Sequence, residues 1–442
     1  MTPPAAPPTA PVSPRRWAGV LSLLAVVLIS YIDRVNVSVL ITDRAFTDHF
    51  GMTGDRVLQG ALMTVFLIGY GLAAFFLTPL YEAALGARRG LLVSVGLWAV
   101  LTLLSPYALG ALMFVAVRFL LGASEGPLFS LKTMYVKEHF APHEVGRPNA
   151  VSSMGVSLGT AVGLPLITYL VHRYDWHTSF VLLALLNAAV GLPLIALFIR
   201  GRHRAGEGRT GQAHAPTGAR RGVAATLREA LRTPRLGCIL LIEIATLAYL
   251  WGSSSWLPAY LLQERHFSLG QMGAVSALPF LTSLASGFLG GHLIDKLSAR
   301  RLPLLFVAGA LGTGSCVLLV ITADAAWLAA TGLVLAGGFW GLQGPAIPTL
   351  VQRHAPAGTV GSAYGVVNGV GNLVSAFMPT AMGAAIALGG GHSFGPGYAL
   401  LIGAQAVTLL CGAWLLLRPG PLTTDDPVTP RRTTPAPPHP TP

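Results

Sequence analysis

The sequence predicts an all-α polytopic membrane protein with twelve transmembrane helices in two pseudo-symmetric six-helix bundles. Of its 442 residues, 53% are hydrophobic and only 10% are charged, whereas soluble domains carry about 25% charged residues. Apolar runs of about twenty residues, enough for a helix to cross a hydrocarbon core roughly 30 Å thick, recur along the chain. They do not alternate in polarity as barrel strands would, so helices are the expected spanning elements.

The apolar runs define twelve expected spans, six on each side of one long polar segment. In chain order they are residues 17–41, 57–80, 89–106, 109–131, 149–171, 179–199, 236–262, 271–294, 303–322, 325–350, 360–388 and 397–417. Because the number of spans is even, both ends of the chain are expected on the same side of the membrane.

The remaining segments are rich in Pro, Gly or Arg and define the expected domain limits. These are a disordered cytoplasmic tail 1–16, an N-terminal bundle 17–199, a basic cytoplasmic linker 200–235, a C-terminal bundle 236–417 and a disordered cytoplasmic tail 418–442. The first apolar run is too long for a signal-peptide core and contains charges, so no cleavage is expected.

The formal net charge of +12 does not indicate nucleic-acid binding, because the basic residues lie in short gaps between apolar runs. Cytoplasmic loops of membrane proteins are enriched in Lys and Arg. With the N-terminus inside, the outer loops hold only Arg44, Arg56, Arg173 and Arg265. This bias predicts cytoplasmic termini in the inner membrane. The histidines fall in tails, loops or span ends, and no metal site or cofactor is expected.

Equivalent loops in the two halves suggest a duplicated six-helix unit. Gly86-Ala87-Arg88-Arg89 follows the second span, and the segment from Gly291 to Arg301 follows the eighth. Such repeats place a binding site between the halves near the membrane midplane, and rocking of the halves alternates access to it.

The loop from Gly291 to Arg301 resembles the signature G-x-L-x-D-[RK]-x-G-[RK]-[RK] of the major facilitator superfamily, with Ser298 in place of a glycine. The resemblance implies a gating role on the cytoplasmic side for Gly291, Asp295, Lys296 and Arg300. The copy in the first half is eroded, with Ala83 and Ala84 at the positions of the Asp-Arg pair.

Within the superfamily the chain is similar to the anion:cation symporter family, whose members carry hexonates, hexuronates, glucarate, tartrate or phthalate. The likeness rests on Tyr31-Ile32-Asp33-Arg34-Val35-Asn36-Val37-Ser38, Arg118-Phe119-Leu120-Leu121-Gly122-Ala123-Ser124-Glu125-Gly126-Pro127, Ser255-Trp256-Leu257-Pro258-Ala259-Tyr260-Leu261 and the segment from Gly361 to Asn372. It implies that the matching acids carry protons and that the arginine of the first span holds the substrate carboxylate. Tyr31 and Tyr70 resemble positions that line the family's site.

Charged residues inside spans cost about 2.5–3.5 kcal/mol each on insertion scales, so each suggests a function. Asp33 and Arg118 fall at similar depth, and Arg118 and Glu125 lie two turns apart on nearly one face. We therefore expect a cluster of two acids and two bases, including Arg34. A guanidinium can hold a carboxylate through two hydrogen bonds, and an anion that competes for Arg34 would change when an acid takes a proton.

We therefore predict proton coupling by Asp33 and Glu125, and substrate binding by Arg34, Tyr31, Tyr70, Arg118, Gln343 and Asn368. The alternative for the charges is pairing that only locks helices together, and for the amides it is interhelical hydrogen bonding. Glu243, an unpaired acid in the seventh span, is expected near the cytoplasmic interface.

The predicted function is proton-coupled uptake of a small organic anion, a sugar acid or other carboxylate, by a monomeric secondary transporter. Export of drugs or metabolites is the first alternative, although Gly159 is followed by Thr160 rather than by the proline typical of many exporters. A non-transporting membrane sensor is a second alternative. An enzyme is not expected, because the spans hold no nucleophile with a base and no metal cluster.

Overall fold

The computed structural model describes residues 14–140, 146–199, 234–298, 300–354 and 360–418. Within these ranges all regular structure is helical, and twelve helical segments are long and apolar enough to cross a membrane. The predicted fold class is confirmed. The linker 200–235 and both tails lie mostly outside the described residues, so the domain limits stay predictions.

Each half of the chain supplies six of these segments. The N-terminal half contains α1 (Pro14–Leu40), α2 (Arg44–His49), α3 (Arg56–Ala84), α4 (Gly86–Leu104), α5 (Ala111–Glu125), α6 (Leu128–His139), α7 (Gly146–Ser153), α8 (Gly155–Arg173), α9 (Trp176–Leu186) and α10 (Leu192–Phe198). The C-terminal half contains α12 (Pro234–Ala259), α13 (Leu269–Lys296), α14 (Leu304–Thr322), α15 (Ala326–Gln343), α16 (Ala346–His354), α17 (Val360–Ser375), α18 (Met378–Leu388) and α19 (Gly395–Leu417).

Glycine–proline pairs interrupt the fourth span of each half. Gly126-Pro127 separates α5 from α6, and Gly344-Pro345 separates α15 from α16. Proline has no backbone N–H, so the carbonyl four residues earlier loses its helical partner. For this reason α15 ends at Gln343, before the expected end of the tenth span at residue 350. The shared interruption agrees with a duplicated six-helix unit.

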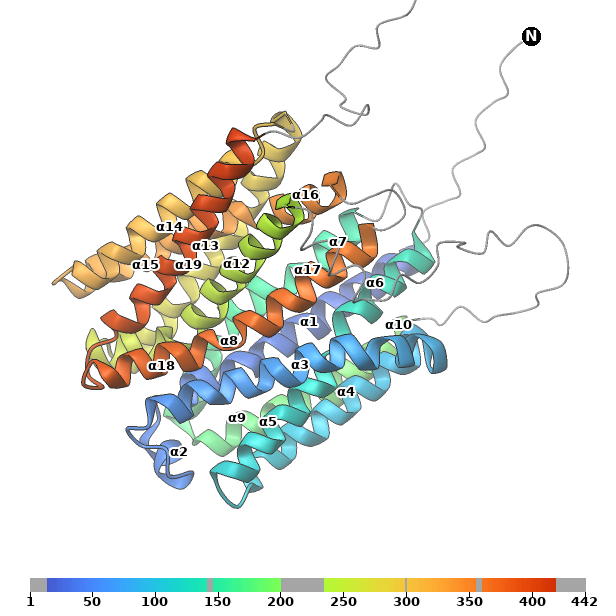
Figure 1. Cartoon of the computed structure of the whole chain (residues 1–442). Coiled ribbons are helices and arrows are strands. Elements are labelled where there is room, and N and C mark those ends of the chain that lie inside the picture. Colours follow the sequence, from blue (N-terminus) through green and yellow to red (C-terminus); the bar gives the residue numbers. More distant parts are fainter. Residues whose placement is uncertain (1–13, 141–145, 200–233, 299, 355–359, 419–442) are drawn as a thin grey trace, which may run out of the picture.

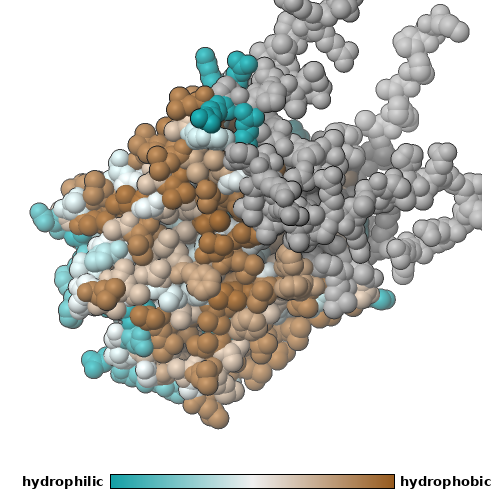
Figure 2. All heavy atoms as spheres, in the orientation of Figure 1, coloured by the Kyte–Doolittle hydropathy of each residue, from teal (hydrophilic) through white to brown (hydrophobic). Residues whose placement is uncertain are grey.

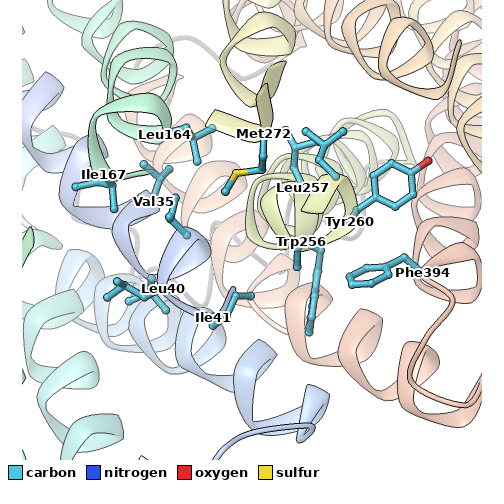
Figure 3. Packing of buried hydrophobic residues seen from close by; sticks show 14 of the residues in the cluster. Val35, Leu40, Ile41, Leu164, Ile167, Trp256, Leu257, Tyr260, Met272 and Phe394 are labelled. Carbon is cyan, nitrogen blue, oxygen red and sulfur yellow. The ribbon is translucent and has the colours of Figure 1, made fainter. Parts of the chain in front are cut away.

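The two halves form bundles that lie side by side (Figure 1). Contacts between them run through α8 with α13, α3 with α18, α3 with α17 and α1 with α12. The central packing is apolar: Val35 and Leu40 of α1 belong to the same buried cluster as Trp256 and Met272 of the C-terminal half (Figure 3). Seven helices, α1, α3, α8, α12, α13, α17 and α18, therefore line the boundary at which a site between the halves is expected.

The outer flanks are apolar, as a lipid-facing surface requires. Phe76, Leu197 and Leu410 lie within spans and are 67%, 70% and 69% exposed. Figure 2 shows hydrophobic side chains over the flank and hydrophilic ones toward the ends of the bundle. Such a large exposed apolar surface is not tolerated in water.

The bundles touch tightly at one end. Because the chain crosses twelve times, Pro14 and Leu417 lie at the same end of the protein, which we call the terminal end. Helix α2 lies at the other end, which we call the opposite end (Figure 1). Toward the opposite end, the Thr64 hydroxyl of α3 donates to the Ala376 carbonyl at 2.6 Å. A Cβ at Gly60 would lie 2.4 Å from the Pro379 carbonyl oxygen.

An arginine adds a polar contact at the same end. Arg56 Nη2 donates to Gln263 Oε1 at 2.7 Å and to the Gly391 carbonyl at 3.3 Å. The backbones of α3 and α18 therefore meet without room for a side chain, and Arg56 ties the N-terminal bundle to two segments of the C-terminal one. The opposite end is closed in this structure.

Candidate functional site

A buried ion pair joins the first and fourth spans. Arg34 Nη2 lies 2.8 Å from Glu125 Oε2, and both side chains are at most 1% exposed. The Ser30 hydroxyl, one turn before Arg34, donates to the same carboxylate oxygen at 2.8 Å. Arg34 Nε and Glu125 Oε1 have no hydrogen-bond partner among the described residues. Both groups of the pair thus keep bonding capacity that a ligand or a proton can use.

Aromatic rings surround the Arg34 guanidinium. Its Cζ lies 4.5 Å from the ring centroid of Tyr31, 4.9 Å from Tyr70, 5.1 Å from Phe66 and 5.2 Å from Trp251. Cations are attracted to ring faces at such distances, more strongly when water is excluded. Trp251 belongs to α12, so the C-terminal bundle completes an enclosure that the N-terminal bundle begins.

Asp33 faces a different helix from its neighbour Arg34. Its Oδ2 accepts hydrogen bonds from the Trp98 indole N–H and, at 2.7 Å, from the Thr102 hydroxyl, both on α4. Its Oδ1 has no partner among the described residues. Consecutive residues of a helix point about 100° apart, which is why one span can supply two separate polar centres.

Arg118 is fully buried near the Arg34–Glu125 pair. Its Cζ lies 4.6 Å from the Phe66 ring, which also contacts Arg34. Within the described part of the chain, none of its three guanidinium nitrogens has a hydrogen-bond partner. A buried guanidinium without partners is costly, so Arg118 is a cation in need of a negative or polar group.

A third buried cation lies further along the fourth span. Lys132 on α6 is 4% exposed, and its Nζ donates to Ser153 of α7 at 2.7 Å. It also lies 4.7 Å from the ring of Phe129, and that ring packs edge-on against Tyr31. Positive charge therefore extends from Arg34 toward the terminal end.

The predicted amides of the C-terminal half occupy two different places. Asn368 on α17 donates through Nδ2 to Glu243 Oε1 at 3.0 Å. Gln343 is buried against Gly309 and donates to Gln405 at 3.4 Å, so its contacts lie within the C-terminal bundle. The substrate-binding roles of both residues stay predictions.

The expectation for Glu243 itself was wrong. This acid is 5% exposed and hydrogen-bonded to Asn368, rather than unpaired at the interface.

Gly291, Asp295 and Lys296 lie at the end of α13, and Arg300 follows it. A Cβ at Gly291 would meet nothing within 4 Å, and Lys296 and Arg300 are exposed. The side chain of Asp295 is outside the described residues. The gating role of these four residues stays a prediction.

Several residues of the site were not predicted from the sequence. Ser30, Phe66, Trp98 and Thr102 are ordinary residues of apolar spans, and their importance follows only from their partners. Spacing offered a weak signal for two of them, since Ser30 lies four residues before Arg34 and Phe66 four residues before Tyr70. No group of three His, Cys, Asp or Glu side chains in the described ranges could hold a metal ion.

Comparisons with known proteins identify the family of the chain. The family model described as Major Facilitator Superfamily matches residues 23–379. The chain is 26% identical over 437 residues to the probable galactarate/D-glucarate transporter GudP of Bacillus subtilis, covering 91% of this chain and 92% of that protein. It is 24% identical over 429 residues to the D-galactonate transporter of Escherichia coli O6:H1, covering 90% and 96%.

Its fold is also that of solved transporter structures. The crystal structure of the D-xylose–proton symporter superposes with a TM-score of 0.69 at 14% identity, covering 90% of this chain and 97% of that one. The fold, the twelve apolar spans and the family match make the chain a multi-pass membrane transporter and not an enzyme. The protein belongs to the Major Facilitator Superfamily.

Proposed function

We propose that the protein takes up a small organic anion, a sugar acid or a similar carboxylate, together with protons. The observation that carries this proposal is the Arg34–Glu125 pair, with aromatic rings around Arg34. Arg118 is an additional buried cation that has no hydrogen-bond partner among the described residues. The relatives named above are a probable galactarate/D-glucarate transporter and a D-galactonate transporter, and these compounds are polyhydroxylated carboxylates.

The balance of buried charge favours an anionic substrate. The described N-terminal bundle buries the cations Arg34, Arg118 and Lys132 but only the carboxyls Asp33 and Glu125. Buried charges are tolerated when they are paired. A bound carboxylate supplies the missing negative charge, and protonation of either acid increases the positive excess that attracts it.

Competition for Arg34 supplies the coupling. In the present state Glu125 accepts from Arg34 and Ser30. A protonated Glu125 loses most of its attraction for the guanidinium, which is then available to bind a carboxylate through two parallel hydrogen bonds. When the proton leaves, Glu125 recovers Arg34 and the anion is released.

We also propose that the terminal end faces the cytoplasm. Basic residues concentrate in the segments of that side, in accordance with the positive-inside rule. The closed opposite end is then the extracellular gate, and opening requires α3 to separate from α18. Alternating access follows from the relative rocking of the two bundles.

Gly60→Val should open the extracellular gate. The new side chain would collide with the Pro379 carbonyl, because even a Cβ lies 2.4 Å from that oxygen. Overpacking costs about 1–3 kcal/mol, a shift of roughly 5- to 150-fold between the two states. Ser38 lines a small cavity beneath this contact, together with Gln59 and Trp256. A Ser38→Cys reporter should react correspondingly faster with an impermeant maleimide added outside.

Gly96→Val is the matched control. Gly96 lies within α4, where a Cβ meets nothing within 4 Å. This variant should leave the labelling rate of the reporter unchanged. Equal rates in the Gly60 and Gly96 variants would contradict the assignment of the gate.

The proposed function is tested by uptake into proteoliposomes that contain the purified full chain. Radiolabelled D-glucarate and D-galactonate should accumulate when the outside is acidic, and a proton ionophore should abolish this accumulation. A sodium gradient alone should have no effect, and neutral D-xylose should not accumulate. Accumulation that follows sodium instead of protons, or absence of uptake of every organic acid tried, would contradict the proposal.

A further inference from the structure

One buried acid lies outside the site described so far. Glu243 is located on α12, in the C-terminal bundle, and its hydrogen-bond partner is Asn368 Nδ2 at 3.0 Å. A Cβ at Gly371 would lie 2.7 Å from Glu243 Cγ. Gly371 therefore allows α17 to approach closely and to enclose this carboxyl. A space built around an acid is unlike the usual surface position of glutamate.

No described cation neutralises Glu243, and no salt bridge to it forms among the described residues. The helices packed against α12 include α1, α3, α13, α16, α17, α18 and α19. Of their described titratable groups, Arg34 and Tyr31 of α1 contact Trp251 on α12, and Tyr398 of α19 contacts Tyr260 just beyond the end of α12. Helix α12 itself adds Arg235, Cys238 and Tyr249. The side chains of Arg353, His354 and Tyr364 are outside the description. An ionised carboxylate buried beside one amide is costly, and such a group takes up a proton instead.

A continuous chain of contacts connects Glu243 with the anion site. Asn368 binds Glu243, and Asn372 Nδ2 donates to Asn368 Oδ1 at 3.3 Å. The Trp251 indole N–H donates to Asn372 Oδ1 at 3.3 Å. The Trp251 ring stacks on Tyr31 with centroids 6.4 Å apart and lies 5.2 Å from the Arg34 guanidinium.

The direction of these bonds makes the chain sensitive to charge. Asn368 donates to the Glu243 carboxyl through the same amide whose oxygen accepts from Asn372. A hydrogen bond to an ionised carboxylate is roughly twice as strong as one to a neutral acceptor. Loss of the Glu243 proton therefore strengthens the hydrogen bond that Asn368 donates to it. The resulting movement of Asn368 changes, through Asn372, the position of Trp251 over Arg34.

We propose that Glu243 is a proton-binding site of the C-terminal bundle, coupled to the anion site through Asn368, Asn372 and Trp251. The proposal deepens the function proposed above and rests on it for the link to transport. In the present state, with the opposite end closed, the Glu243 carboxyl holds a proton. The proton leaves to water when movement of the bundles hydrates α12. One cycle then moves the Glu243 proton in addition to the protons carried by Asp33 and Glu125.

Infrared spectroscopy of the reconstituted full chain tests proton binding without any transport. The C=O stretching band of protonated carboxyl groups should be weaker in Glu243→Gln than in the wild type by the amount of one group. In Asn368→Leu the same band should shift, because its hydrogen bond is lost. Asp324→Asn, at an exposed acid, should leave the spectrum unchanged. A Glu243→Gln spectrum identical to that of the wild type would overturn the proposal.

Transport measurements then test the coupling. From the accumulation of D-glucarate at known pH gradients, the number of protons per anion should fall by one in Glu243→Gln. Adding D-glucarate should shift the Glu243 band in the wild type but not in Asn372→Leu. An unchanged ratio would overturn the coupling, and displacement of the proton band by Na⁺ would make Glu243 a sodium ligand instead. If the wild-type protein transports none of the organic acids tried, the proposed function fails, while the infrared result still decides whether Glu243 binds a proton.

Discussion

Arg34→Gln should abolish anion uptake, and Arg34→Lys should reduce it at least a hundredfold. Among the described residues, Arg34 is the only one of three buried N-terminal cations that is paired with a carboxylate and enclosed by four rings. Two hydrogen bonds to a charged partner contribute about 3 kcal/mol or more, which corresponds to roughly a hundredfold in affinity. Lysine keeps the charge but loses the planar fork that binds both carboxylate oxygens. Initial rates of D-glucarate uptake in proteoliposomes measure the effect.

Removal of one partner of a buried pair also reduces stability, by about 3–5 kcal/mol, so folding must be checked separately. Gel filtration and thermal unfolding of each variant in detergent serve this purpose. Arg34→Lys separates the two effects, because it retains a cation beside Glu125 and should therefore lose less stability than Arg34→Gln. Arg44→Gln is the matched control: Arg44 is 88% exposed and forms only a surface pair with Asp48. Undiminished uptake in well-folded Arg34→Gln would refute the proposed mechanism.

Glu125→Gln and Asp33→Asn should each uncouple anion movement from protons. The amide resembles a protonated carboxyl in shape but exchanges no proton, so the anion can bind while the pH gradient no longer drives it. We expect no accumulation of labelled D-glucarate under an inward proton gradient. Exchange of labelled for unlabelled D-glucarate across liposomes preloaded with the anion should persist, because exchange needs no net proton transfer.

The two acids should differ in their effect on binding. Glu125→Gln frees Arg34 from its carboxylate, so the anion should bind more tightly than in the wild type. Asp33→Asn changes a carboxyl held by Trp98 and Thr102, so binding through Arg34 should change less. Asp324→Asn serves as the exposed control. Wild-type accumulation in both variants would eliminate a coupling role for these acids.

Prediction from sequence succeeded for features that are local. A span is recognised from the apolar character of about twenty consecutive residues, and all twelve predicted spans correspond to helical segments in the structure. Intramembrane charges stand out for the same reason, because they interrupt an otherwise apolar run. Asp33, Arg34, Arg118 and Glu125 are all buried.

Prediction was weaker where the partner of a residue belongs to another helix. Gln343 and Asn368 are both polar residues in the C-terminal spans, yet Asn368 contacts Glu243 and Gln343 contacts Gln405. Periodicity identifies which residues share a face of one helix. It does not determine toward which neighbouring helix that face is turned.

The sequence alone thus determined the twelve-helix membrane architecture, its division into two halves and the presence of two acids and two bases in the N-terminal spans. Only the tertiary structure decided their partners. Arg34 pairs with Glu125, 91 positions away, while the adjacent Asp33 turns to Trp98 and Thr102. Trp251 closes the site from the other bundle. The physical reason is that hydropathy is a property of each segment by itself, whereas these contacts depend on how rigid helices rotate and pack against one another.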